Sequence, residues 1–134
     1  MDISVQFPGG KKVDALVSGQ VIHTDQSVAG GGEGSAPEPF TLFLASLATC
    51  AGVYVLGFCQ ARGISTDGIS LLQHNLFDAE HRRLQSVSIE VRLPASFPDR
   101  YRDAVRRAAE TCKVKRTLFE PPAFEVKTTT AVAP

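Results

Sequence analysis

The pattern of apolar positions along the chain is dominated by one segment, Phe40 to Cys59, which reads FTLFLASLATCAGVYVLGFC and has no charged side chain. A segment of this length is typical of a membrane span or of a helix buried on every side. Its flanks lack an aromatic belt and a basic cluster, and the other apolar segments need a surface to cover. We therefore predict a long buried helix in a soluble domain, beginning at Pro39 and stopped by Gly63.

The segments around this helix have the two-residue period of strands. Residues 2–7 alternate between apolar and polar side chains, and 12–18 and 20–24 follow after a turn at 8–10. Together they predict an antiparallel meander. Residues 64–77 alternate loosely and 84–93 alternate cleanly, with a polar hairpin connection at 78–83. A last strand is expected at 124–130.

A second helix is predicted to start at Ser96 as its N-cap. Its arginines alternate with acidic residues, so a solvated face is the better interpretation than a binding patch. A short helical turn is expected at 113–119. This order of strands and helices predicts an α+β fold, and the length of 134 residues fits a single domain, 1–134.

A Gly-rich stretch, DQSVAGGGEGSAPEP at 25–39, precedes the long helix. Its composition is typical of a flexible loop, but long loops in compact domains also border functional sites, and both interpretations stay open. The stretch lacks the Gly-Lys-Ser/Thr ending of a phosphate-binding loop. Inside the helix, small residues at 45, 46, 48, 49, 51 and 52 indicate that something packs very closely there.

Composition excludes several classes of function. Fourteen basic and fourteen acidic residues balance, so no overall charge attracts nucleic acid or an anionic membrane. No CxxC pair occurs, and the three histidines do not fall at metal-ligand spacing with any cysteine, so neither a metal nor a cofactor is expected. The N-terminus MDISVQFPGGKK has no apolar signal segment. We expect a cytoplasmic protein, in a compartment where thiols stay free.

The three cysteines differ in their surroundings. Cys59 lies among large apolar residues and is expected to act as a small hydrophobe. Cys50 has small neighbours, which leave room for a reactive sulfur and a small substrate. Cys112 is followed by three basic residues within four positions, so positive charge is expected around its sulfur. Spacing alone does not say that Cys50 and Cys112 meet.

Two segments resemble the signatures of a known family. PEPFTLFLASLATC is similar to the PxELLLASLAAC-type motif of the OsmC-like family, which includes osmotically inducible protein C and the organic hydroperoxide resistance proteins. CKVKRTL resembles the second signature, and the order of elements agrees along essentially the whole chain. The resemblance implies an OsmC-like fold, with antiparallel sheets around a long buried central helix. It also implies an intertwined homodimer with its sites at the subunit interface.

The resemblance also implies an activity. In the peroxidase members, a thiolate at the position of Cys50 attacks the distal oxygen of an organic hydroperoxide and becomes a sulfenic acid. A thiol at the position of Cys112 then forms a disulfide, which an external dithiol reduces. Phe40, Phe43 and Leu47 are expected to line the substrate pocket. The function so implied is hydroperoxide detoxification in an oxidative stress response.

The peroxidase members use two further residues, an Arg in the N-terminal strands and a Glu about ten residues before the first Cys. In this chain no Arg precedes Arg62, and Phe40 stands ten residues before Cys50. Glu38 is the nearest acidic residue. Glu38, and Arg116 or Arg62, are therefore candidates for the activating or orienting roles.

Two other functions remain open for the same fold. One is a non-catalytic protein that binds a small apolar ligand, such as a fatty acid, at the dimer interface. The other is a stress-related structural dimer with inert thiols. Consumption of peroxide would favour the enzyme, and copurifying lipid-like material would favour the binding protein.

Overall fold

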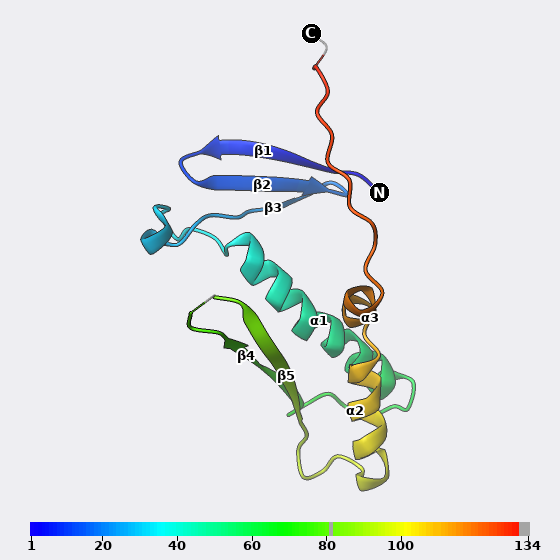
Figure 1. Cartoon of the computed structure of the whole chain (residues 1–134). Coiled ribbons are helices and arrows are strands. Elements are labelled where there is room, and N and C mark those ends of the chain that lie inside the picture. The colour runs from blue at the N-terminus through cyan, green and yellow to red at the C-terminus, as the bar shows by residue number, and fades with distance from the viewer. Residues whose placement is uncertain (81, 132–134) are drawn as a thin grey trace.

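The computed structural model describes residues 1–80 and 82–131, so residue 81 of the expected hairpin connection lies outside the described part. The chain forms an α+β fold with two antiparallel sheets (Figure 1). This fold class was predicted from the order of segments. The elements in order are β1 (Ile3–Gly9), β2 (Lys12–Val17), β3 (Gln20–Ile22), α1 (Pro39–Gln60), β4 (Ser70–Phe77), β5 (Leu84–Arg92), α2 (Arg102–Glu110) and α3 (Lys113–Phe119).

Helix α1 begins and ends as the sequence predicts. Pro39 occupies the first turn, where its missing N–H costs nothing. After Gln60 the chain turns at Gly63, whose φ of 63° suits glycine, and the N–H of Ile64 donates back to the Cys59 carbonyl at 3.0 Å. The helix is long and apolar enough to cross a membrane by length and composition. Its buried face, however, packs within the domain, as that of a core helix does.

The core lies between α1, α2 and the β4–β5 hairpin. Every fourth residue of α1 from position 47 to 59 is buried, which places all four on one face. Val105 and Ala109 of α2 face them, and Phe97 and the inner side of β5 complete the cluster. In Figure 1 the hairpin and α2 lie on different sides of the lower half of α1. This packing holds α1, β5 and α2 in a fixed arrangement.

The expectation that α1 is buried on every side is wrong for the single chain. Val53 is 63% exposed and Leu56 is 42% exposed. A Cβ atom placed on Gly52 or Gly57 would meet nothing within 4 Å, so the close packing expected at the small residues is missing at Gly52, whereas Ala51 is fully buried in the core. The physical reason is that, within the described residues, the elements packed most extensively on α1 are α2, α3 and the β4–β5 hairpin, which cover part of its circumference.

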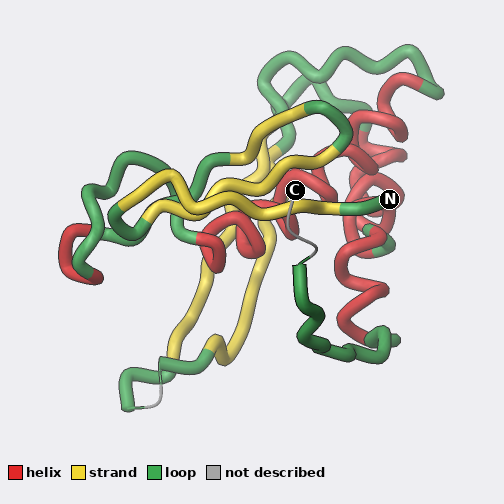
Figure 2. The backbone as a smooth tube through the Cα atoms, turned by 90° about the horizontal axis from the view of Figure 1, so that it is seen from above, coloured by secondary structure: helices red, strands yellow, loops and turns green. Residues whose placement is uncertain are grey.

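The first sheet, in the order β1-β2-β3, pairs in simple antiparallel register with Ile3 opposite Val17. It stands beyond the N-terminal end of α1, separate from the core (Figures 1 and 2). Ile3, Val5 and Phe7 were predicted to face a core, yet they are 56%, 52% and 81% exposed. None of the described residues of this sheet belongs to the core cluster. An apolar sheet face is therefore left uncovered.

The Gly-rich loop is built around one buried carboxylate. Asp25 accepts hydrogen bonds from the backbone N–H groups of Gln26, Glu33 and Ser35 and from the Ser35 hydroxyl, at 2.7–3.2 Å. These hydrogen bonds, above all those from Ser35, lower the pKa of Asp25 to about 2. Burial of the carboxylate raises the pKa and opposes them only in part. At Gly32 a Cβ would lie 2.1 Å from a backbone oxygen, so no side chain fits. The loop is thus a defined structure.

Several boundaries differ from the predictions. The β4 strand starts at Ser70 and not at residue 64. Helix α2 starts at Arg102, after a 3-10 turn, and Ser96 does not cap it, because the N–H of Phe97 donates to the Pro94 carbonyl and makes a turn there. The strand expected at 124–130 is not formed within the described residues. The helix expected at 113–119 is present as α3.

The buried Asp25 carboxylate predicts a particular dependence of stability on pH. The pKa of Asp25 is lower in the folded state than the ordinary value of 3.8. The contribution of Asp25 to the free energy of unfolding is therefore complete above pH 3.8 and is lost as the pH falls toward about 2. Asp25→Asn should lower the urea midpoint at pH 7, and its difference from the wild type should shrink between pH 3.8 and 2. Urea titrations followed by circular dichroism measure this. The exposed Asp67→Asn is the control, and a difference that does not change with pH would contradict the prediction.

Candidate active site

The two predicted reactive cysteines lie on neighbouring helices. Cys50 is half-buried in the middle of α1. Cys112 is fully buried between α2 and α3, and it is the N-cap residue of α3 in extended conformation. Helices α1 and α3 are in contact. All three cysteines are free thiols.

One side-chain hydrogen bond joins α1 to α3. The Arg116 guanidinium donates to the Tyr54 hydroxyl, with Nη2 and Oη 3.4 Å apart. Tyr54 follows Cys50 by one helical turn, and Arg116 follows Cys112 by one turn. The contact therefore brings together the helical turns that follow the two cysteines.

An apolar cavity of about 410 Å³ adjoins this region. Phe43 and Leu47 of α1 line it, whereas Phe40 is half-exposed outside it and stacks on Phe43 with ring centres 5.5 Å apart. Cys50 is not part of the lining. It follows Leu47, which lines the cavity, by one helical turn. The other lining residues are Leu84, Val87, Ile89, Val91, Arg106, Ala109, Glu110, Lys115, Leu118 and Phe119.

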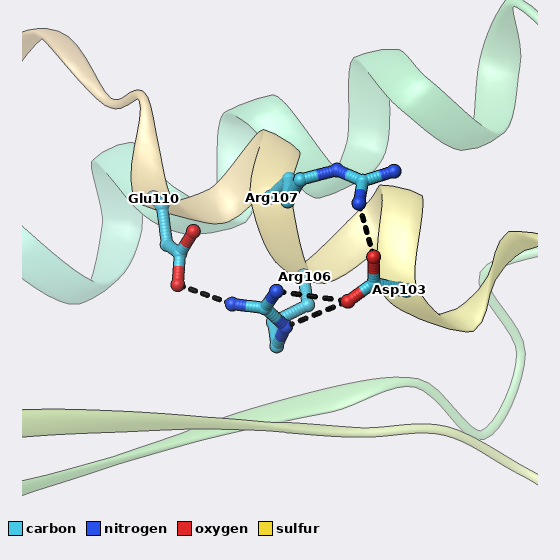
Figure 3. Close-up of polar contacts among 4 residues, drawn as sticks. All are labelled: Asp103, Arg106, Arg107 and Glu110. Carbon is cyan, nitrogen blue, oxygen red and sulfur yellow. Dashed lines mark hydrogen bonds and ion pairs between the residues drawn. The ribbon is translucent and has the colours of Figure 1, made fainter.

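Charged residues form one rim of the cavity. Arg106 lies between Asp103, at 2.8 Å, and Glu110, at 2.5 Å, while Arg107 also pairs with Asp103 (Figure 3). The hydrogen bond from Arg106, first among several causes, lowers the pKa of Asp103. These exposed arginines are neutralised on their own helix, which fits the predicted solvated face. Lys115 also lines the cavity and has no ion pair within the part of the chain that the structure describes.

Two of the proposed activating residues lie far from Cys50 in the same chain. Glu38 is the N-cap residue of α1, twelve residues before Cys50 and thus about 18 Å away along the helix axis. Hydrogen bonds from the Ser27 hydroxyl and backbone N–H occupy its carboxylate and lower its pKa. Arg62 lies about 18 Å beyond Cys50 at the other end, with its guanidinium 3.7 Å from the centre of the Phe58 ring. Only Arg116 reaches the central turns of α1.

Cys59 occupies the core as expected. It is fully buried, and burial raises the pKa of its thiol, opposed in part by the charge of Arg62. A thiol that stays protonated is a poor nucleophile. Sequence reasoning missed Tyr54, although a signal was present. Tyr54 stands four residues after Cys50, as Arg116 stands four after Cys112.

Comparisons with known proteins agree with this fold. Residues 32–127 match the family model described as OsmC-like protein. A proposed osmotic stress induced and detoxification response protein from Psychrobacter arcticus 273-4 is similar in structure, with a TM-score of 0.72 and 26% identity over 86% of this chain and 85% of that one. No protein among the curated sequences matches this chain.

A second solved structure is more distant in sequence. It is described as an organic hydroperoxide resistance protein OsmC, predicted redox protein, regulator of sulfide bond formation, from Legionella pneumophila. It has a TM-score of 0.55 and 18% identity over 88% of this chain and 89% of that one, and at this identity it supports the fold alone. Since the family model spans most of the chain, including both cysteine segments of the candidate site, the chain belongs to the OsmC-like protein family.

Proposed function

We propose that the protein is a cytoplasmic thiol-dependent peroxidase that reduces organic hydroperoxides, with Cys50 as the attacking thiol and Cys112 as the resolving thiol. The observation that carries the proposal is the Arg116–Tyr54 hydrogen bond, which joins the two turns that follow these cysteines. The apolar cavity beside Cys50 supports an apolar substrate. The proposed role is hydroperoxide detoxification during oxidative stress.

The proposed reaction has two steps on the protein. The Cys50 thiolate attacks the distal peroxide oxygen, the O–O bond breaks, and the oxygen that stays on sulfur forms a sulfenic acid. The leaving alkoxide takes up a proton and departs as the alcohol. The Cys112 thiolate then attacks the Cys50 sulfur, a disulfide forms, and the hydroxide that leaves takes up a proton from solvent to become water. An external dithiol reduces this disulfide and completes the cycle.

We also propose that the working form is a homodimer. Two apolar surfaces are uncovered in the single chain, namely the side of α1 around Val53 and the face of the first sheet that carries Phe7. The open space at Gly52 and Gly57 would let another helix approach closely. Residues 124–130 pair with no strand within the described part of the chain, and in the proposed dimer they are free to pair with the second chain. In the proposed homodimer, a second copy covers these surfaces.

A second candidate function rests on the cavity. Its lining is mainly apolar, with Arg106, Glu110 and Lys115 as its charged members, and includes neither Cys50 nor Cys112. A volume of about 410 Å³ is within the range of ligand sites, roughly 300–1,000 Å³. The cavity could therefore hold an apolar ligand, such as a fatty acid, without any reaction at sulfur.

The peroxidase proposal predicts distinct results for each cysteine. With tert-butyl hydroperoxide and dithiothreitol, Cys50→Ser should lose all turnover, because it removes the attacking sulfur. Cys112→Ser should still form a sulfenic acid, trapped by dimedone and detected by mass spectrometry, but no intramolecular disulfide. Cys59→Ala is the matched control and should keep its turnover, since that thiol lies in the core. Full turnover in Cys50→Ser would contradict the proposal.

The binding proposal predicts that filling the cavity abolishes ligand uptake. Val87 lines the cavity on β5, and Val87→Phe should weaken binding of the fluorescent fatty acid cis-parinaric acid by at least tenfold, because the ring takes the ligand's space. Ser88→Phe adds the same ring on the opposite face of the strand and should bind as the wild type does. If both variants bind the fatty acid equally well, the fatty acid does not occupy this cavity and the binding proposal is contradicted.

The homodimer predicts that a charge on the uncovered side of α1 separates the subunits. Val53→Glu should shift the mass measured by light scattering from two chains to one, since a buried carboxylate without a partner is costly. Gln85→Glu, at an exposed position of β5, is the control. A wild-type protein that is monomeric at micromolar concentration would contradict the proposal.

A further inference from the structure

We propose that Tyr54 is a general acid that protonates the leaving alkoxide, and that Arg116 is the positioning residue that holds its hydroxyl. This inference rests on the proposed peroxidase function. It is carried by the hydrogen bond in which the Arg116 guanidinium donates to the Tyr54 oxygen at 3.4 Å. The geometry of α1 and the position of the cavity support it independently.

The first support is the place of Tyr54 on its helix. Residues four positions apart lie on the same side of a helix, with Cβ atoms about 5–6 Å apart. Large helical side chains generally lean toward the N-terminus, which from residue 54 is the direction of the turn that carries Cys50. Both residues are half-buried and border the open side of α1. The phenol is therefore within reach of a small molecule at the Cys50 sulfur.

The second support is the state of the hydroxyl. Its oxygen accepts the bond from Arg116, and it makes no other hydrogen bond within the described residues, so its own proton is free to be donated. A guanidinium is always charged and cannot accept a proton. It can instead stabilise negative charge on the phenol oxygen as the proton leaves. This arrangement suits proton donation.

The third support is the direction from which a substrate would arrive. Phe43 lies seven residues before Cys50, on the same side of α1, and lines the apolar cavity together with Leu47. A hydroperoxide whose apolar part lies in the cavity places its O–O bond at Cys50. Tyr54 then lies on the far side of Cys50 from the cavity.

The chemical step balances with these groups alone. The Cys50 thiolate bonds to the distal oxygen and the O–O bond breaks with its electron pair on the proximal oxygen. The distal oxygen keeps its hydrogen as the sulfenic acid. The proximal oxygen takes the Tyr54 proton and leaves as the alcohol, and solvent returns a proton to the tyrosinate. No residue at Glu38 or Arg62 is needed, which fits their distance from Cys50.

The test compares two oxidants that differ in their need for a proton. Reduction of tert-butyl hydroperoxide releases a strongly basic alkoxide, whereas reduction of peracetic acid releases acetate, which leaves without protonation. Stopped-flow oxidation of the full chain, carrying Cys112→Ser to isolate the first step, measures both rates. Tyr54→Phe should slow the hydroperoxide reaction by about a hundredfold and leave the peracid reaction nearly unchanged.

Two further variants separate the roles. Arg116→Met should show the same selective loss, smaller in size, and adding it to Tyr54→Phe should cost nothing more, because the two residues act as one unit. Tyr101→Phe is the control, since Tyr101 packs on Phe58 away from Cys50. Equal slowing with both oxidants, or slowing with neither, would overturn the role of Tyr54. If unmodified Tyr54 protein reacts with neither oxidant, the peroxidase proposal fails as well.

Discussion

The packing of one face of α1 against α2 and the β4–β5 hairpin is the contact on which the rest of the structure depends. Leu47, Ala51, Val55 and Cys59 follow each other at a spacing of four, so they form a single buried line. Helix α2 packs against this line. The residues that follow α2, namely Cys112 and helix α3, are therefore also placed beside α1. Cys50 lies at the edge of the buried line. The candidate site is thus a consequence of how the core packs.

This arrangement assigns opposite surroundings to cysteines that look alike in sequence. Cys59 points into the core, where burial raises the pKa of its thiol and keeps it unreactive. Cys50, nine residues earlier, reaches the boundary between the core and the open side of the helix. Both cysteines lie in the same apolar segment of the sequence. Their surroundings differ only because their side chains leave the helix in different directions.

The sequence predicted the parts of the fold that depend on local patterns. The limits of α1, the clean alternation of β5 and the short helix α3 all follow from caps, period and turn residues near them in the chain. Burial could not be predicted in the same way. Ile3, Val5 and Phe7 alternate as a half-buried strand should, yet this chain provides nothing to cover them. The Tyr54–Arg116 contact joins residues 62 positions apart, and no local pattern fixes such a pair.

If the proposed homodimer covers the apolar face of the first sheet, the stability of the protein depends on its concentration. A three-stranded sheet whose apolar side faces water gains little from folding alone, and its contribution to stability would arise when a second molecule arrives. Stability would then follow mass action, rising with the amount of protein present and falling as it is depleted. In the proposed homodimer, a higher concentration of the chain would thus also make each copy longer-lived.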